Sequence, residues 1–172
     1  MITMIRSAVA RQYGAALALM RGCVMRADSA AWLGAVGKFP FWHVAYHTLY
    51  YADLYLSPDE SAFRPQPFHL DGYNFLGPQP WAPDMRVAAD RPYDQDMLTA
   101  YVDAIRAKAK SAVDGETESS LGGPSGFGWL EFTRFELHLY NLRHLQHHGG
   151  QLAAVLRSQG GDGVDWIPSA PL

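Results

Sequence analysis

The chain has 172 residues, of which 48% are hydrophobic and 18% are charged, and its formal net charge at pH 7 is −3. This length and composition predict one globular domain over residues 1–172 and exclude a disordered chain, and the absence of a basic run excludes a nucleic-acid footprint. The longest apolar stretch near the N-terminus, between Arg11 and Arg21, is too short to cross a membrane, and the single cysteine, Cys23, fits a reducing, cytoplasmic compartment without an internal disulfide.

The first predicted helix runs from residue 2 to about residue 26, because apolar side chains recur there at spacings of three and four. These side chains are Ile5, Val9, Tyr13, Leu17, Met20 and Val24. Asp28 and Ser29 are helix-capping residue types, and they predict a break followed by a short helical turn around Trp32. Two glycines and a proline then end that turn.

The second predicted helix runs from Pro40 to Leu56, and a Ser-Pro pair ends it. Its inward-facing stripe is expected to consist of Val44, His47, Tyr51 and Leu54. His43 lies one turn before His47, so it competes with His47 for any role inside the protein.

The segment between residues 57 and 92 combines prolines with aromatic residues. It holds seven of the chain's eleven prolines, namely Pro58, Pro65, Pro67, Pro78, Pro80, Pro83 and Pro92. Long structureless loops are uncommon in compact domains and aromatic residues argue against disorder, so we predict a long ordered loop between the second and third helices. One hypothesis makes this loop a wall of a functional pocket, lined by Phe68, Tyr73, Phe75 or Trp81. The alternative is a surface flap that only covers apolar area. His69, within the loop, is either a substrate contact or an ordinary loop histidine.

The third predicted helix spans Tyr93 to Val113, with a cap near Asp94 and an end at Gly115. Residues 114–128 are rich in glycine, serine and threonine, and they predict a mobile linker.

The fourth predicted helix begins at Thr133, which is followed three residues later by Glu136 in the capping-box pattern. It runs to about Arg157, and the glycines just beyond end it. The tail is irregular, and its one aromatic residue, Trp166, is expected to pack against the helices.

Four helices with apolar stripes, without an alternating strand pattern or a repeat, predict an all-α protein built as a four-helix bundle. Functional sites in such bundles are built from inward-facing side chains of helices that face one another.

Three polar residues share one face of the last helix, because His144, His148 and Gln151 are spaced at i, i+4 and i+7. Two histidines one turn apart are separated by about 6 Å of axial rise, so both can reach one metal ion. The alternative is that they are ordinary core or surface histidines. His138 and His147 lie off this face, and we assign them no role.

A bundle brings His47 towards His144 and His148. Three neutral imidazoles leave at least one metal position open, as catalytic sites require, and they suit zinc, nickel, iron or copper. Gln151 and Tyr51 are placed to contact a ligand ring or a substrate. Because ligation needs neutral imidazoles, acid is expected to release the metal near their usual pKa of about 6.5.

These residues carry a resemblance to the DinB/YfiT-like superfamily, a group of damage-inducible, metal-binding four-helix bundles. The resemblance rests on Tyr46-His47-Thr48 and on His144-x-x-x-His148-x-Gly150-Gln151. It implies that His47, His144 and His148 are the metal ligands and favours His47 over His43. A residue such as arginine often precedes the Gly-Gln pair in the family, whereas Gly149 stands here. We expect Gly150 to permit close approach of a neighbouring helix or loop.

The resemblance also implies an activity. The superfamily includes transferases that join bacillithiol, mycothiol or glutathione to small molecules, and a related isomerase. An open-site metal, here zinc or nickel with iron as a further candidate, makes a bound thiol nucleophilic or activates water for hydrolysis. The expected partner is therefore a small molecule, for example a low-molecular-weight thiol. Because members of the family often form dimers, the resemblance also allows a homodimer. The competing interpretations are a non-catalytic, stress-related metal-binding protein and a metal-free helical interaction module.

Overall fold

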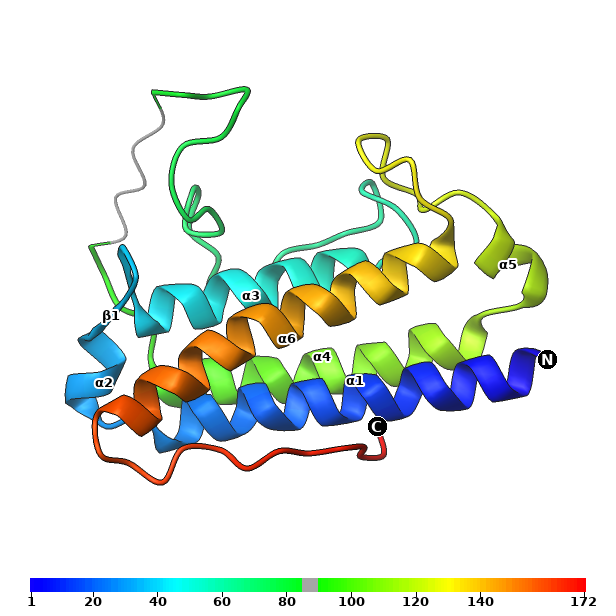
Figure 1. Ribbon diagram of the computed structural model, residues 1–172. Coiled ribbons are helices and arrows are strands. Elements are labelled where there is room, and N and C mark those ends of the chain that lie inside the picture. Colours follow the sequence, from blue (N-terminus) through cyan, green and yellow to red (C-terminus); the bar gives the residue numbers. More distant parts are fainter. Residues whose placement is uncertain (85–89) are drawn as a thin grey trace.

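The computed structural model describes residues 1–84 and 90–172, and over these residues the protein is all-α apart from one very small sheet (Figure 1). Its elements are α1 (Ile2–Arg26), α2 (Ser29–Leu33), β1 (Ala35–Val36), β2 (Phe39–Pro40), α3 (Phe41–Tyr55), α4 (Gln95–Gly115), α5 (Glu118–Gly122) and α6 (Arg134–Ser158). The four long helices α1, α3, α4 and α6 lie side by side, as the sequence pattern predicts.

Each long helix packs against two others. Helix α1 contacts α4 and α6, and α3 contacts the same two helices from the other side. The largest fully buried side chains include Trp42, Tyr13, Tyr46, Phe41 and Leu17. Each such side chain contributes roughly 1.5–3 kcal/mol through removal of apolar surface from water, so the core between the helices is the main source of stability.

Side-chain caps explain where two of the long helices, α4 and α6, begin. The side chain of Asp94 accepts hydrogen bonds from the backbone N–H groups of Asp96 and Met97, and the hydroxyl of Thr133 accepts one from Glu136 at 3.2 Å. Pro40 precedes the first turn of α3 as its cap residue. Gly160, with φ of 81°, adopts the left-handed conformation that ends α6. The predicted helix positions are confirmed to within a few residues.

The segment between α4 and α6 differs from the predicted mobile linker. It contains α5, which begins with a capping box between Thr117 and Ser120. It also buries Phe127, whose ring meets that of Tyr55 edge-on at 5.4 Å between centroids. The local caps and this buried ring order the segment. Neither feature produces a periodic pattern of apolar residues, so the sequence pattern did not predict this order. The β1–β2 hairpin was also not predicted, because each strand has only two residues.

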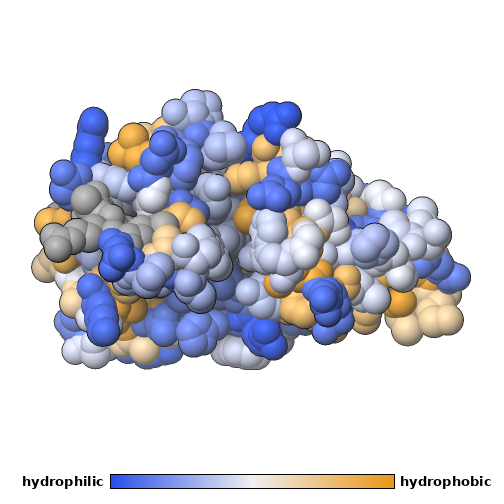
Figure 2. All heavy atoms as spheres, turned by 90° about the horizontal axis from the view of Figure 1, so that it is seen from above, coloured by the Kyte–Doolittle hydropathy of each residue, from blue (hydrophilic) through white to orange (hydrophobic). Residues whose placement is uncertain are grey.

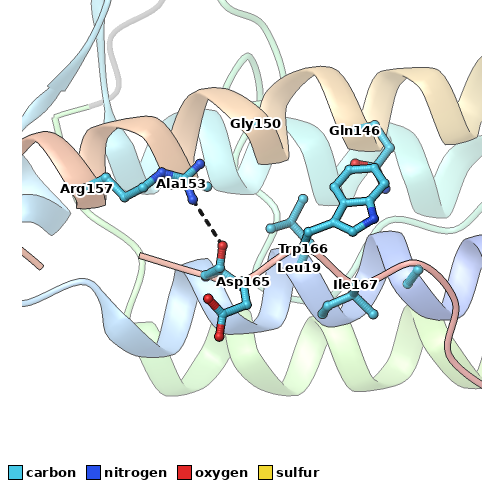
Figure 3. A pocket seen from close by; sticks show the side chains of 10 residues that line it. Leu19, Gln146, Gly150, Ala153, Arg157, Asp165, Trp166 and Ile167 are labelled. Carbon is cyan, nitrogen blue, oxygen red and sulfur yellow. Dashed lines mark hydrogen bonds between the residues drawn. The ribbon is translucent and has the colours of Figure 1, made fainter. Parts of the chain in front are cut away.

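The C-terminal tail runs back along α1 (Figure 1), where the N–H of Ala170 donates to the carbonyl of Arg11. The expectation that an aromatic residue packs against the helices is wrong for Trp166, which is 81% exposed. Val164 is buried instead. Trp166 and Ile167 stand beside a shallow pocket whose other side is formed by Leu19 of α1 and by α6 (Figure 3).

Gly149, and not Gly150, is the glycine that permits close packing of α6. A Cβ atom at Gly149 would lie 3.0 Å from Cδ2 of Leu19 on α1, whereas a Cβ at Gly150 would meet nothing within 4 Å. The expectation for Gly150 is therefore wrong, because this position lines the open pocket beside Trp166, where no neighbouring helix or loop approaches it closely (Figure 3).

The loops between α3 and α4 and before α6 project on the same side of the helices (Figure 1). Hydrophilic and hydrophobic residues are mixed over the face seen from that side (Figure 2). Within residues 1–84 and 90–172, no helix combines the length and the hydropathy that a membrane crossing requires.

Candidate metal centre

The structure brings His47 of α3 together with His144 and His148 of α6. One ligand nitrogen from each side chain lies within 4.8 Å of the others. The pairwise distances between ring centroids are 5.1, 4.9 and 4.8 Å. The helical period places the two α6 histidines on one face, and the packing of α3 against α6 supplies the third ring.

The spacing of the ring nitrogens suits a single metal ion. Nε2 of His47 and Nε2 of His144 are 3.2 Å apart. In a tetrahedral site with metal–nitrogen bonds of about 2.0–2.1 Å, two ligand nitrogens are about 3.3 Å apart. The two nitrogens are thus at the separation that a shared tetrahedral ion requires.

Hydrogen bonds to oxygen acceptors set the protonation of two of the rings. Nδ1 of His47 donates to the backbone carbonyl of Asn74 at 2.7 Å, and Nδ1 of His148 donates to Oε1 of Gln151 at 2.8 Å. The proton on Nδ1 leaves Nε2 of each neutral ring with a free lone pair. Oxygen acceptors of this kind orient metal-binding histidines and raise the basicity of the coordinating nitrogen.

His144 has a buried polar atom without a partner. Its Nδ1 makes no hydrogen bond among the described residues. Its Nε2 faces the Nε2 of His47, which already carries its ring proton on Nδ1. When both Nε2 atoms bind one cation, neither carries a proton, and the ring proton of neutral His144 lies on its Nδ1. The donor set, its spacing and the tautomers of His47 and His148 therefore fit a divalent metal bound by three imidazoles.

Burial keeps these imidazoles neutral. Loss of hydration lowers the pKa of His47 to about 3 and that of His144 to about 2, and the neighbouring histidines add to both effects. Burial also lowers the pKa of His148, while its hydrogen bond to Gln151 acts in the opposite direction. Because metal ligation requires neutral imidazole, the site is ready for a cation at neutral pH.

The three rings open into a pocket of about 290 Å³. It is lined by His47, Tyr51, Tyr55, Gln79, Trp81, Tyr140, His144 and His148. Gln79 and Trp81 belong to the long loop after α3, so this loop does form part of the wall. Of the four aromatic residues predicted to line it, only Trp81 does. Phe68 packs against Tyr93, Tyr73 lies in the core against Trp42, and Phe75 is not a lining residue.

The remaining histidines have separate surroundings. His43 is buried and donates through Nε2 to the carbonyl of Tyr73 at 2.8 Å, so it is a satisfied core residue. Nδ1 of His69 lies 2.6 Å from the hydroxyl of Tyr46. His138 lies between Tyr13 and Glu116, and His147 accepts from the amide of Gln151 at 3.3 Å. The choice of His47 over His43 agrees with this geometry.

Sequence reasoning missed Asn74, Tyr55, Gln79 and Tyr140 as parts of this site. Tyr55 follows Tyr51 by one turn and Tyr140 precedes His144 by one turn, so the helical period contains a signal for both. Asn74 acts on His47 through its backbone carbonyl, and no side-chain pattern predicts such a contact. Its side-chain amide also donates to the hydroxyl of Tyr51 at 3.4 Å.

Replacement of Gln151 by alanine is expected to weaken metal binding by about tenfold, the low end of the usual range for residues that support a ligand, because water can replace an exposed acceptor. The measurement is zinc affinity at pH 7 by competition with a chromophoric chelator. His147→Ala is the matched control, since it leaves the acceptor of His148 in place. Equal affinities for Gln151→Ala and the parent protein would contradict the role of Gln151.

The metal-free protein is expected to lose stability as the pH falls below about 6.5. In the folded state His47 and His144 stay neutral until about pH 3 and pH 2, while in the unfolded state they take up protons near pH 6.5. The unfolded state therefore binds more protons between these values, and acid favours it. The sequence predicts that acid protonates these histidines and releases a metal near a pH of about 6.5. In the folded protein, His47 and His144 are protonated only at a much lower pH.

Urea unfolding of chelator-treated protein at pH 7.0, 5.5 and 4.5 measures this effect. The double variant His47→Gln, His144→Gln should show a shallower fall in the free energy of unfolding than the parent. The same slope in both proteins would show that the two rings are not neutral and buried.

The candidate metal centre contains the facing Nε2 atoms of His47 and His144. The rings of His47 and His148 are each oriented by a hydrogen bond from Nδ1 to an oxygen acceptor. Comparisons with protein-family models, with curated proteins and with solved structures give no match to this chain.

Proposed function

We propose that the chain is a DinB/YfiT-like four-helix bundle that binds one divalent metal through His47, His144 and His148 and acts on a small molecule at the open side of that metal. The observation that carries the proposal is the convergence of the three rings, with the two facing Nε2 atoms 3.2 Å apart. Imidazole ligands favour zinc or nickel, with iron as a third candidate.

The reaction that the site supports best is a thiol-dependent transfer. A bound divalent metal supplies Lewis acidity, which lowers the pKa of a coordinated thiol or water. A thiol starts from a pKa of about 8.5 and loses its proton to solvent, whereas water starts from about 15.7 and benefits from a general base. Among the eight lining residues of the pocket, none is an aspartate or a glutamate. Hydrolysis is for this reason the second candidate.

The chain's own side chains would position the reactants. Burial raises the pKa of Tyr51 to about 12, so its hydroxyl keeps its proton at neutral pH and can donate to a substrate atom. Tyr55 is buried behind it, and its ring contacts those of Tyr51 and Tyr140. These rings exclude water from one side of the three histidines. The half-buried amide of Gln79 offers a polar contact on the loop side.

The test is conjugation of a thiol to an aryl chloride by zinc- or nickel-loaded protein, followed by absorbance and compared with hydrolysis of a nitrophenyl ester. Metal-dependent conjugation that is lost in His144→Ala would support the transferase. Ester cleavage alone would favour the hydrolase. Bound metal without turnover of either substrate would favour a non-catalytic metal-binding protein. Failure to bind any divalent metal would leave the metal-free interaction module.

Homodimerisation stays a prediction from the family resemblance. Size-exclusion chromatography with light scattering measures the molar mass in solution. A mass close to 38 kDa, about twice that of the 19.1 kDa chain, is the expected result for a dimer.

A further inference from the structure

We infer that the pocket beside the three histidines selects a monoanionic ligand with a flat aromatic body, which makes the thiol of the proposed reaction one that carries an aromatic ring and no charge besides its thiolate. The inference rests on the proposed function, because it needs a metal at the three histidines. It goes further by naming the chemical class of the bound molecule.

The charge of the pocket points to a single negative charge on the ligand. Among residues 1–84 and 90–172, the lining consists of three neutral imidazoles, three tyrosines, one tryptophan and one glutamine, and it includes no lysine, arginine, aspartate or glutamate. A divalent cation held by neutral ligands keeps its full charge, so an anionic donor atom balances part of it. A second charge on the ligand would be desolvated here without an ion-pair partner, which is unfavourable.

One cationic side chain contacts a lining ring without lining the pocket itself. The guanidinium of Arg143 is over the ring of Tyr140, 5.3 Å from its centroid, and Arg143 is exposed on α6. Glutathione-like thiols, which carry several charged groups, therefore find no matching partner among the residues that line this pocket.

The shape of the wall points to a flat ring. The ring of Tyr51 lies 4.9 Å from that of His47 and 5.8 Å from that of Tyr55, and Tyr55 meets Tyr140 edge-on at 5.4 Å. Phe127 packs behind Tyr55 and holds it in place. Aromatic rings favour offset or edge-on contacts at these separations, so a ring bound among them gains contacts that an aliphatic chain does not.

Trp81 supplies an aromatic surface at the mouth of the pocket. Its side chain lines the pocket although it is 73% exposed. An exposed indole contributes little to folding, and a ligand ring that stacks on it removes apolar surface of both partners from water. With a volume of about 290 Å³ the pocket has the size of one small ligand rather than a peptide.

The probes are chosen to separate ring shape from thiol acidity and charge. Phenylmethanethiol and butane-1-thiol both carry the thiol on a saturated carbon and have no other ionisable group, but only phenylmethanethiol has an aromatic ring. Glutathione adds several charged groups. Protein loaded with cobalt(II) reports two things: its visible d–d bands show that the metal is bound, and a sulfur-to-cobalt charge-transfer band shows that a thiolate is coordinated.

The expected result is that phenylmethanethiol binds about tenfold more tightly than butane-1-thiol, with glutathione weaker than both. Trp81→Leu and Tyr140→Leu should each reduce this preference without changing the cobalt content. Trp166→Leu is the matched control, because Trp166 is also an exposed tryptophan and lies in the tail, away from this pocket.

The outcomes separate this inference from the proposed function. Absence of cobalt d–d bands would remove the proposed function itself. Bound cobalt with equal affinity for the two uncharged thiols, or with glutathione binding most tightly, would overturn the inference alone. A preference for the ring that survives both Trp81→Leu and Tyr140→Leu would also overturn it, because the aromatic wall would not be its cause.

Discussion

Replacement of any one of His47, His144 and His148 by alanine is expected to abolish stable metal binding. Each substitution leaves two imidazoles, and within the described part of the chain no cysteine or carboxylate lines the pocket to take the vacant place. Loss of a residue that only supports a ligand weakens binding by about 10–100-fold, so loss of a ligand itself should exceed that range. The parent protein should retain about one divalent ion per chain, and each variant should retain almost none.

Metal analysis of dialysed protein purified without a histidine tag measures this directly. His147→Ala and His69→Ala are the matched controls, because both remove an imidazole outside the group of three. Circular dichroism shows whether each variant keeps its helices. Retention of metal by all three single variants, or its loss in His147→Ala, would show that the ion binds elsewhere.

Bound metal should also stabilise the parent fold. At a free zinc concentration 100 times the dissociation constant, the gain in free energy of unfolding is about 2.7 kcal/mol. Thermal melting with and without a chelator measures the gain, and His148→Ala should show none of it. An equal shift in the variant would mean that the chelator acts on something other than this site.

Replacement of Glu116 by alanine is expected to destabilise the fold by about 3–5 kcal/mol, the usual cost of removing one partner from a buried ion pair. Nε of Arg134 and Nε2 of His138 lie 3.0 and 3.1 Å from the same oxygen of Glu116. The side chains of Glu116 and Arg134 are 8% and 9% exposed. Alanine would leave the Arg134 guanidinium buried without its carboxylate, and proteins of ordinary stability have only about 5–15 kcal/mol to lose.

Urea unfolding at pH 7 gives the free energy of unfolding of this variant. Asp114→Ala is the matched control, because it removes one partner of the exposed Lys110–Asp114 pair, whose contribution is about 0–1 kcal/mol. If Glu116→Ala costs no more than Asp114→Ala, the buried pair does not stabilise the junction of α4, α5 and α6.

The pH dependence offers a second measurement of the same group. Burial alone would raise the pKa of Glu116, but hydrogen bonds from His138, Ser120 and Arg134 outweigh it and lower the pKa to about 2. A carboxylate with a lowered pKa stabilises the fold above the unfolded value of about 4.3, and this stability is lost as the pH falls towards about 2. Glu116→Gln should flatten the acid limb of the stability curve over that window.

The sequence by itself determined the long helices and the shared face of two of the three histidines in the candidate site. Apolar residues at spacings of three and four locate each long helix, and local caps such as Asp94 and Thr133 locate two of their starts, because these interactions involve neighbours within one turn. The same period places His144 and His148 on one face. All these signals depend on residues a few positions apart.

Only the tertiary structure decided which residues complete the site. His43 and His47 lie one turn apart on α3. Packing against α6 brings His47 beside His144, while the backbone carbonyl of Tyr73 accepts a hydrogen bond from His43. Contacts across the chain likewise place Trp81 in the pocket and Asn74 on His47. Such contacts join residues far apart in sequence, often through backbone atoms that every residue type carries, so no local pattern of side chains can predict them.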